Sequence, residues 1–204
     1  MCKIRIRRPV LGCLALMTAG FANPASADEV ADKGAFVQRL FAAKTFDKKT
    51  YACFVRRYDA VHLKQHPRQK VGAMKLLLTA EKLPEDGELH YGFSVGVSLR
   101  KQPGNWTTGG DCGHAEASAS KGEELAINCS VDCDGGGVAV ALAGDDKAVT
   151  VRLERLHLWG PRDDGERELE VGADDRVFRL DRVDAAECAA LVTDHEEQAA
   201  LRHK

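Results

Sequence analysis

The sequence predicts a mainly β fold: an antiparallel meander that forms a small barrel or sandwich, with short N-terminal and C-terminal helices. Three observations support this prediction. Apolar and polar residues alternate along several segments after Thr50, short Gly- and Asp-rich turns separate these segments, and apolar residues follow a helical period only near the two ends. Short turns favour antiparallel neighbours, and roughly eight strands suffice for a meander to close into a small barrel.

The composition is that of a globular protein. The 204 residues include 44% hydrophobic and 29% charged side chains, and the mean hydropathy is -0.30. These values exclude a disordered chain and an integral membrane protein, and a content of 19 Gly excludes a collagen-like chain.

Residues 1–27 have the three parts of a secretory signal peptide. A basic start precedes an apolar stretch from Val10 to Ala22, and small residues at positions 25–27 predict cleavage after Ala27. The apolar stretch of about 13 residues is too short for a bilayer core, which needs roughly 20. We therefore expect residues 28–204 to form a single β-rich domain that is periplasmic or secreted and has no membrane span after processing.

Removal of this leader leaves 25 Lys and Arg against 31 Asp and Glu, a net charge of -6. An acidic balance disfavours nucleic acid and anionic membrane surfaces as partners. The expected compartment is oxidising, so the remaining cysteines are considered first as disulfide candidates.

A helix is predicted over Asp32–Ala43, because its apolar residues recur on one stripe. The next clear element is a strand over Leu89–Leu99, in which every odd position is apolar. Its even positions from Gly92 to Ser98 are small, so we expect that face to meet solvent or to be approached closely by another backbone or a ligand.

The same alternation predicts three further strands, and weaker patterns predict four more. The three clear ones span Leu125–Cys133, Val138–Leu142 and Val149–Leu153, and the weaker ones span Tyr51–Arg57, Gln69–Ala80, Gly113–Ser120 and Val177–Arg182. After Leu153 the apolar parity shifts to Leu156 and Leu158, which predicts a β-bulge or a bend.

The C-terminal region is predicted to turn helical again. Asp184 followed by Glu187 indicates a helix start, and Cys188, Leu191 and Val192 then share one face. The preceding acidic segment, Pro161–Asp175, is interpreted as a solvated loop or a frayed hairpin. A calcium site there is the alternative, although the regular spacing of acidic ligands is missing.

An antiparallel meander with a helix at each end resembles, in outline, the calycin class of lipocalin-type barrels. The resemblance is architectural. The Gly-x-Trp motif that such proteins carry on their first strand has only Gly104-Asn105-Trp106 as a counterpart, and this falls mid-chain. The resemblance therefore implies a barrel outline and transfers no site residues.

Five cysteines remain after export, so at least one is unpaired in a monomer. Cys53 and Cys188 are the preferred pair, because they lie at the two ends of the domain on faces expected to be buried. Folding a hairpin about residues 121–122 brings Cys112 within reach of both Cys129 and Cys133, and the sequence does not choose between them.

A metal or catalytic site is the alternative use of these residues. A structural zinc site needs four Cys or His ligands, and four such side chains are available in Cys112, His114, Cys129 and Cys133. An oxidising compartment nevertheless favours a disulfide. His62 and His66 have ligand spacing on a helical turn, but no metalloprotease motif accompanies them and their neighbours are solvated residues. No motif pairs a nucleophile with a base, so we expect no cofactor and rank an enzyme last.

These observations favour a non-enzymatic exported protein that binds a small apolar or amphipathic ligand or an envelope component. The candidate ligand-binding residues are Tyr91, Phe93, Trp106 and Trp159. The alternative is a disulfide-stabilised protein-binding or inhibitory module that uses an exposed strand edge or the loop from Cys129 to Gly137.

Overall fold

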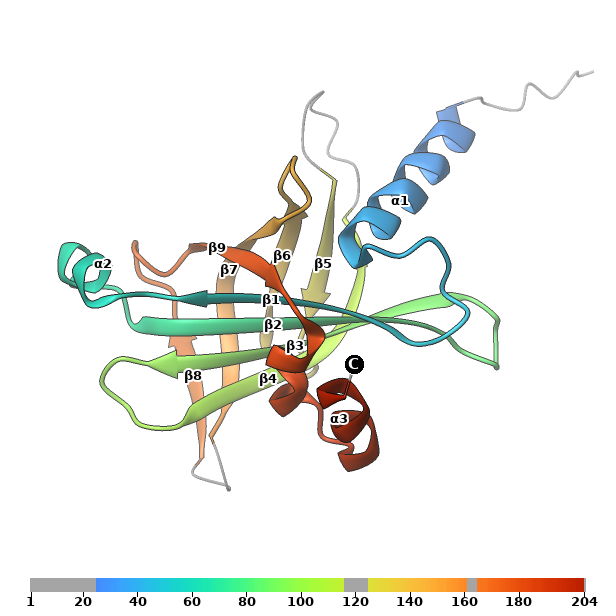
Figure 1. The fold of residues 1–204 in the computed structure, drawn as a ribbon. Helices are drawn as coiled ribbons and strands as arrows, with labels where there is room; N and C mark the ends of the chain where they lie inside the picture. The colour runs from blue at the N-terminus through green and yellow to red at the C-terminus, as the bar shows by residue number, and fades with distance from the viewer. Residues whose placement is uncertain (1–24, 116–124, 161–164, 204) are drawn as a thin grey trace, which may run out of the picture.

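The computed structural model describes residues 25–115, 125–160 and 165–203, which form nine strands and four short helices or helical turns (Figure 1). In chain order these elements are α1 (Ala25–Phe41), β1 (Thr50–Arg57), α2 (Ala60–Gln65), β2 (Val71–Lys82), β3 (Leu89–Leu99), β4 (Asn105–His114), β5 (Ala126–Ser130), β6 (Gly136–Leu142), β7 (Ala148–Trp159), β8 (Glu166–Glu170), β9 (Val177–Val183), the 3-10 helix η2 (Ala185–Leu191) and α3 (His195–Arg202).

Eight of the strands close into an antiparallel barrel. Strands β1 to β6 pair in sequence, β6 pairs with β7, β7 with β9, and β9 returns to β1. Strand β8 pairs with the distal half of the long β7, beyond the part that pairs with β9. The mainly β fold and the barrel expected from the alternating pattern are confirmed.

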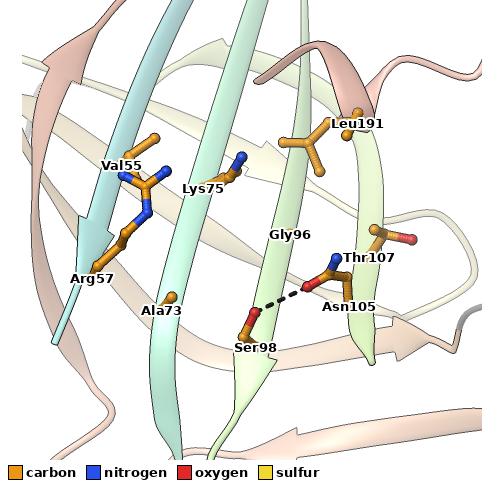
Figure 2. A pocket seen from close by; sticks show the side chains of 10 residues that line it. Val55, Arg57, Ala73, Lys75, Gly96, Ser98, Asn105, Thr107 and Leu191 are labelled. Carbon is orange, nitrogen blue, oxygen red and sulfur yellow. Dashed lines mark hydrogen bonds between the residues drawn. The ribbon is translucent and has the colours of Figure 1, made fainter. Parts of the chain in front are cut away.

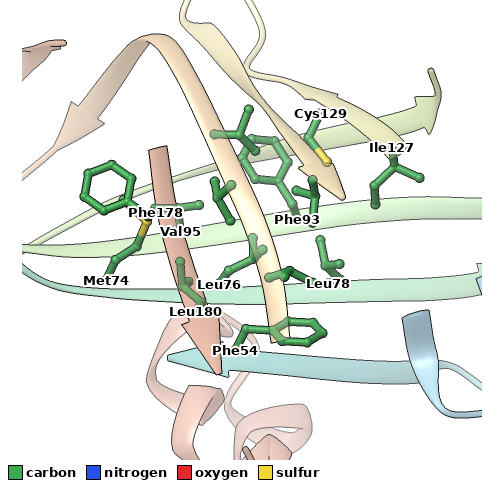
Figure 3. Packing of buried hydrophobic residues seen from close by; sticks show 14 of the residues in the cluster. Phe54, Met74, Leu76, Leu78, Phe93, Val95, Ile127, Cys129, Phe178 and Leu180 are labelled. Carbon is green, nitrogen blue, oxygen red and sulfur yellow. The ribbon is translucent and has the colours of Figure 1, made fainter. Parts of the chain in front are cut away.

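The barrel interior is filled by apolar side chains from its strands (Figure 3). On β3 the predicted inward residues Phe93, Val95 and Val97 are all buried. Each large apolar side chain that leaves water contributes roughly 1.5–3 kcal/mol to folding, so this interior is the main source of stability.

The parity shift after Leu153 is a β-bulge, as predicted. In the β6–β7 ladder Val138 pairs with Leu153, whereas Gly136, two residues earlier, pairs with Leu156. One extra residue on β7 therefore keeps both leucines inside, and each is nearly or fully buried.

Several predicted boundaries were wrong. The strand expected at Gly113–Ser120 is β4, Asn105–His114, while residues 116–120 lie outside the described chain. Strand β5 ends at Ser130, so Cys133 lies in a turn with a φ of 56° rather than on a strand. The acidic segment does form a hairpin strand, β8, paired with β7.

Helices also differ from expectation. The segments that form α2 and α3 were not predicted as helices; each begins after an Asp whose carboxylate accepts a backbone N–H of the first turn. Residues 185–191 form a 3-10 helix, with Asp184 as the expected cap. The predicted cleavage point after Ala27 falls within α1, and the rest of the leader, residues 1–24, lies outside the described chain.

The C-terminal segment is fastened to the outside of the barrel by a disulfide between Cys53 and Cys188, whose Cα atoms are 5.9 Å apart. This confirms the preferred pair. Around it, Val55 and Leu77 of the outer barrel face pack against Leu191 of η2. A Cβ on Gly96 would lie 2.7 Å from the Leu191 Cδ2 atom, so the small-residue face of β3 receives a side chain of η2.

The second disulfide joins Cys112 to Cys129, which face each other directly across β4 and β5 with Cα atoms 3.9 Å apart. The sequence had placed Cys112 diagonally between Cys129 and Cys133. Cys129 is buried in the barrel interior, and Cys133 is exposed as a free thiol.

Two disulfides are consistent with an exported protein. No helix of the described residues is long and apolar enough to cross a bilayer.

We predict that the double variant Cys53→Ser/Cys188→Ser loses about 5 kcal/mol of unfolding free energy, because the bridge closes a very long loop. Urea denaturation measures the loss, and limited proteolysis should show earlier cleavage after residue 184. The matched control Cys133→Ser should stay within about 0.5 kcal/mol of wild type. Equal stability of the double variant and wild type would contradict this role.

We also predict that Gly110→Ala destabilises the barrel by about 2–3 kcal/mol, because a Cβ there would overlap the carbonyl oxygen of Ser130 on β5. Gly113, on the same strand, has open space within 4 Å of the position that a Cβ would occupy. Gly113→Ala should therefore change stability by less than about 0.5 kcal/mol in the same thermal or urea unfolding assay. Similar losses in both variants would refute the close approach.

Candidate functional site

The two ends of strand β3 lie in different surroundings. At its start, the Tyr91 ring stacks on Phe41 of α1, with centroids 6.3 Å apart, and the C-terminal part of α1 packs into the barrel core. Arg182 secures this helix by donating to the carbonyl oxygens of Arg39 and Leu40, the last turn of α1. At the other end of β3, Leu99 borders a surface hollow.

This hollow, called the rim groove below, has a volume of about 630 Å³. It lies between the loop that follows α2, the end of β3 with the loop after it, and β8. Its lining residues are Pro67, Arg68, Gln69, Lys70, Leu99, Arg100, Lys101, Gln102, Arg167, Glu168 and Leu169.

Hydrogen bonds hold the walls of the rim groove in place. Arg100 Nη1 donates to the carbonyl oxygens of His66 and Gln69, at 3.2 and 3.1 Å, which ties the loop after α2 to β3. The buried carboxylate of Asp175 accepts the backbone N–H groups of Lys70 and Val71 at 2.8 and 3.1 Å. The groove is therefore formed by fixed backbone, which favours binding without a large ordering cost.

The rim groove is strongly cationic. Five of its lining residues are Lys or Arg and one, Glu168, is acidic, whereas the whole chain carries a formal charge of -2. The acceptors of Arg100 are neutral carbonyl groups, so they do not cancel its charge. Among the groups that oppose this charge are Asp174, 4.0 Å from Arg68, and the fully buried Asp175.

The floor of the rim groove is apolar and adjoins the barrel interior. Leu169 is 2% exposed and belongs to the core, and Leu99 packs against this core. Arg167 lies over the ring of the buried Trp106, 4.7 Å from its centroid. Within the described residues, the Trp106 Nε1 and Gln102 Oε1 atoms are buried without a hydrogen-bond partner. Burying such atoms lowers the stability of the fold unless a water molecule or a ligand supplies the missing hydrogen bond.

The four candidate ligand-binding residues do not gather in one place. Tyr91 lies near α1, where burial raises the pKa of its phenol, and Phe93 is 3% exposed within the core. Trp106 is buried beside the rim groove, through its contact with Arg167. Trp159 is 40% exposed and pairs with Thr107, the residue that follows Trp106 on β4. Their role in binding stays a prediction.

The residues considered for metal or catalysis have other surroundings. Cys112 and Cys129 are oxidised in a disulfide, which removes two of the four zinc ligands, and His114 packs edge-on against Tyr91 at 5.5 Å. His62 and His66 stack on each other at 4.3 Å, and His62 Nε2 lies 3.0 Å from Gln69 Oε1. The described residues contain no group of three or more His, Cys, Asp or Glu arranged to hold a metal. Asp163 and Asp164, of the calcium alternative, lie outside them.

A second hollow lies on the outer barrel face beside η2, but it measures only about 90 Å³ (Figure 2). It is bordered by Gly96 and Leu191, and Ser98 Oγ donates to Asn105 Oδ1 at 3.0 Å across it. Of its two cations, Arg57 bonds the carboxylate of Glu187, and Lys75 donates to the Glu187 backbone carbonyl oxygen. This hollow is too small for a ligand of ordinary size. The rim groove also exceeds the hollow over β5 to β7, about 490 Å³, and the one between η2 and α3, about 430 Å³, so we take it as the candidate site.

The rim groove was not predicted from the sequence, because three separate segments contribute to it and none carries a motif. The only sequence signal is that basic residues cluster just outside two strands, at positions 68 and 70 and at positions 100 and 101. Such residues are ordinary at strand ends, and only the closed barrel brings them to one rim.

We predict that acidification from pH 7 to pH 5 destabilises the protein through His114. Burial, and then the charge of Lys33, lower the pKa of this imidazole below its usual 6.5. The fold therefore favours neutral His114, and this stability is present above pH 6.5 and lost as the pH falls through the lower folded value. His114→Gln should flatten the melting temperature between pH 7 and pH 5, and His203→Gln, at the exposed end of α3, should not. A wild-type slope in the His114 variant would contradict this origin.

Comparison with known proteins assigns no family. No protein-family model, curated protein or solved structure matches this chain. The function is therefore argued from the geometry of the chain itself.

Proposed function

We propose that this chain is an exported, non-enzymatic binding protein that takes a small amphipathic ligand in the rim groove. The observation that supports this most directly is the composition of the groove, which combines an apolar floor at Leu99 and Leu169 with a polar, charged rim. An amphipathic molecule has the same two parts. The volume of about 630 Å³ lies in the usual range of small-molecule sites, roughly 300–1,000 Å³.

The ligand belongs at the rim because the barrel interior is occupied. Residues such as Phe54, Leu76 and Val95 fill it and are almost completely shielded from solvent (Figure 3). A ligand placed among them would have to displace close-packed side chains, which costs more than it returns in contacts. The rim groove offers contact with Leu169, at the edge of the core, and with Leu99, without that displacement.

The chemistry of the groove favours binding over catalysis. Its described lining consists of Lys, Arg, Gln, Glu, Leu and Pro. Glu168 and the two lysines are groups of acid–base character, but no Ser, Thr, Cys or His lies beside them for such a base to activate. Cationic donors on a rigid frame bind and orient a ligand, and this frame is fixed by the bonds of Arg100 and Asp175.

A protein-binding module is the second candidate, supported by the turn from Val131 to Gly136. The disulfide at Cys129 fixes its start, and Arg155 donates to the carbonyl oxygen of Asp134 at its tip. A braced turn of this kind loses little entropy on binding a partner. The edge of β8 supports it less, because its exposed charged residues oppose strand addition.

The test is to identify what the exported protein carries. Protein purified from the periplasm under native conditions is extracted and analysed by mass spectrometry, alongside Leu99→Trp, which fills the groove floor. The matched control is Leu83→Trp, an exposed leucine after β2 at the opposite end of β3. Circular dichroism and melting temperature establish that both variants fold.

The proposal expects an amphipathic molecule in wild type and in Leu83→Trp, and a loss of about tenfold in Leu99→Trp, which corresponds to roughly 1.4 kcal/mol of binding free energy. Absence of any such molecule, or equal amounts in all three proteins, would reject the rim groove as the site. A stoichiometric protein partner in place of a small molecule would favour the second candidate.

A further inference from the structure

We infer that the rim groove selects its ligand by an anionic head group, and that the ligand is a single-chain anionic amphiphile, of which a long-chain carboxylate is the simplest, whose tail lies on the apolar floor. This inference rests on the proposed function and adds the chemical class of the ligand. It is carried by three features of the groove: its excess of positive charge, its supply of hydrogen-bond donors, and its size.

The positive charge of the groove is not a general property of the surface. The chain as a whole carries a formal charge of -2, and some cations elsewhere are paired, among them Arg39 with Asp146 at 2.6 Å and Arg57 with Glu187 at 2.7 Å. In the groove, five cationic residues line the wall beside the single carboxylate of Glu168. Charges of one sign gathered in a concave site focus the potential and attract the opposite charge.

Nearby carboxylates reduce this potential without reversing it. Asp175 is completely buried and its oxygens accept two backbone N–H groups, so it acts as a structural acceptor. The partly buried Asp174 faces the exposed Arg68 at 4.0 Å and offsets part of the charge of this one cation. Lys101 and Arg167 have no carboxylate bond among those described, and both border the hollow.

The groove also offers donors in excess of acceptors. Guanidinium and ammonium groups only donate hydrogen bonds, and they bind carboxylate oxygens with shorter, stronger bonds than neutral donors do. Beneath Arg167, the Trp106 indole N–H is buried without an acceptor among the described residues and lies outside the lining of the hollow, while Gln102 of the lining contributes one buried acceptor, Oε1, that has no donor. An oxygen-rich anionic head group supplies acceptors, which a hydroxyl does only in part and a cationic head group not at all.

The volume of the groove and its apolar floor restrict the class of ligand further. A hollow of about 630 Å³ suits one compact ligand, and its apolar floor at Leu99 and Leu169 is short and continuous with the core. One alkyl chain matches that floor. A single-chain anionic amphiphile therefore satisfies the rim and the floor together, whereas a small inorganic anion leaves the floor exposed.

The test compares three probes that share a twelve-carbon chain: dodecanoate, dodecan-1-ol and dodecyltrimethylammonium, each below its micelle concentration. Binding is followed by intrinsic fluorescence in a Trp159→Phe background, in which Trp106, beside the groove, is the remaining tryptophan of the chain. Dodecanoate should bind at least about tenfold more tightly than either other probe. Its affinity should fall as NaCl rises from about 50 to about 500 mM, since salt screens exposed charges. Acetate, the head group alone, should bind weakly.

The charge is tested by Arg68→Glu/Lys101→Glu, two exposed rim positions whose reversal leaves the packing of the floor unchanged. This variant should weaken dodecanoate by about tenfold, at roughly two- to fivefold for each exposed charge, and leave dodecan-1-ol unchanged. The matched control is Arg152→Glu, in the separate hollow over β5 to β7, which should bind dodecanoate as wild type does.

The outcomes separate the two levels of the proposal. Equal affinity for all three probes, or an unaltered dodecanoate affinity in the double variant, would overturn the head-group inference. If Leu99→Trp, which adds a tryptophan and is therefore followed by isothermal titration calorimetry, still weakened every probe, the rim groove would remain a ligand site. Failure of every probe to bind in a Leu99-dependent manner would overturn both. Binding of acetate with the affinity of dodecanoate would overturn the role of the chain and leave a site for small anions.

Discussion

The narrowness of the barrel is the constraint on which the rest of the structure depends. Eight strands enclose a space that the inward side chains of the strands themselves can fill, and here residues such as Leu76, Phe93 and Leu180 do fill it (Figure 3). Closure also pairs every barrel strand on both sides, so the sheet is stable without a partner. A binding function must then be placed at the ends or on the outer faces.

The two ends and the outer face are used differently. One end is occupied by α1, whose final carbonyl groups are completed by Arg182. The outer face of β1 to β3 is covered by η2, which the Cys53–Cys188 disulfide holds in place and which Leu191 fits against Gly96. At the rim where β3 ends, the hollow between that end and β8 is open. There, charged loops lie beside the edge of the core, and the ligand site that we propose uses both.

The sequence was informative where one periodic pattern dominated. The alternation along Leu89–Leu99 defined β3 completely, and the shifted parity after Leu153 located the bulge. Strand β4 was misplaced, because its glycines at 109 and 110 carry no apolar signal and are required by the close approach of neighbouring backbone. The rim groove escaped prediction for a different reason: alternation identifies an inward face, but not which loops the closed barrel brings together. Trp106 was a candidate from sequence alone, and only the structure places it under Arg167.

The most direct measurement of the central claim, that the ligand binds at the rim and not inside the barrel, is methyl NMR of leucine- and valine-labelled protein titrated with dodecanoate. The account predicts saturable shift changes at Leu99 and Leu169, which border the groove, with little change at Leu76 and Val95 in the interior. Large changes at the interior methyl groups, with Leu99 and Leu169 unaffected, would contradict it.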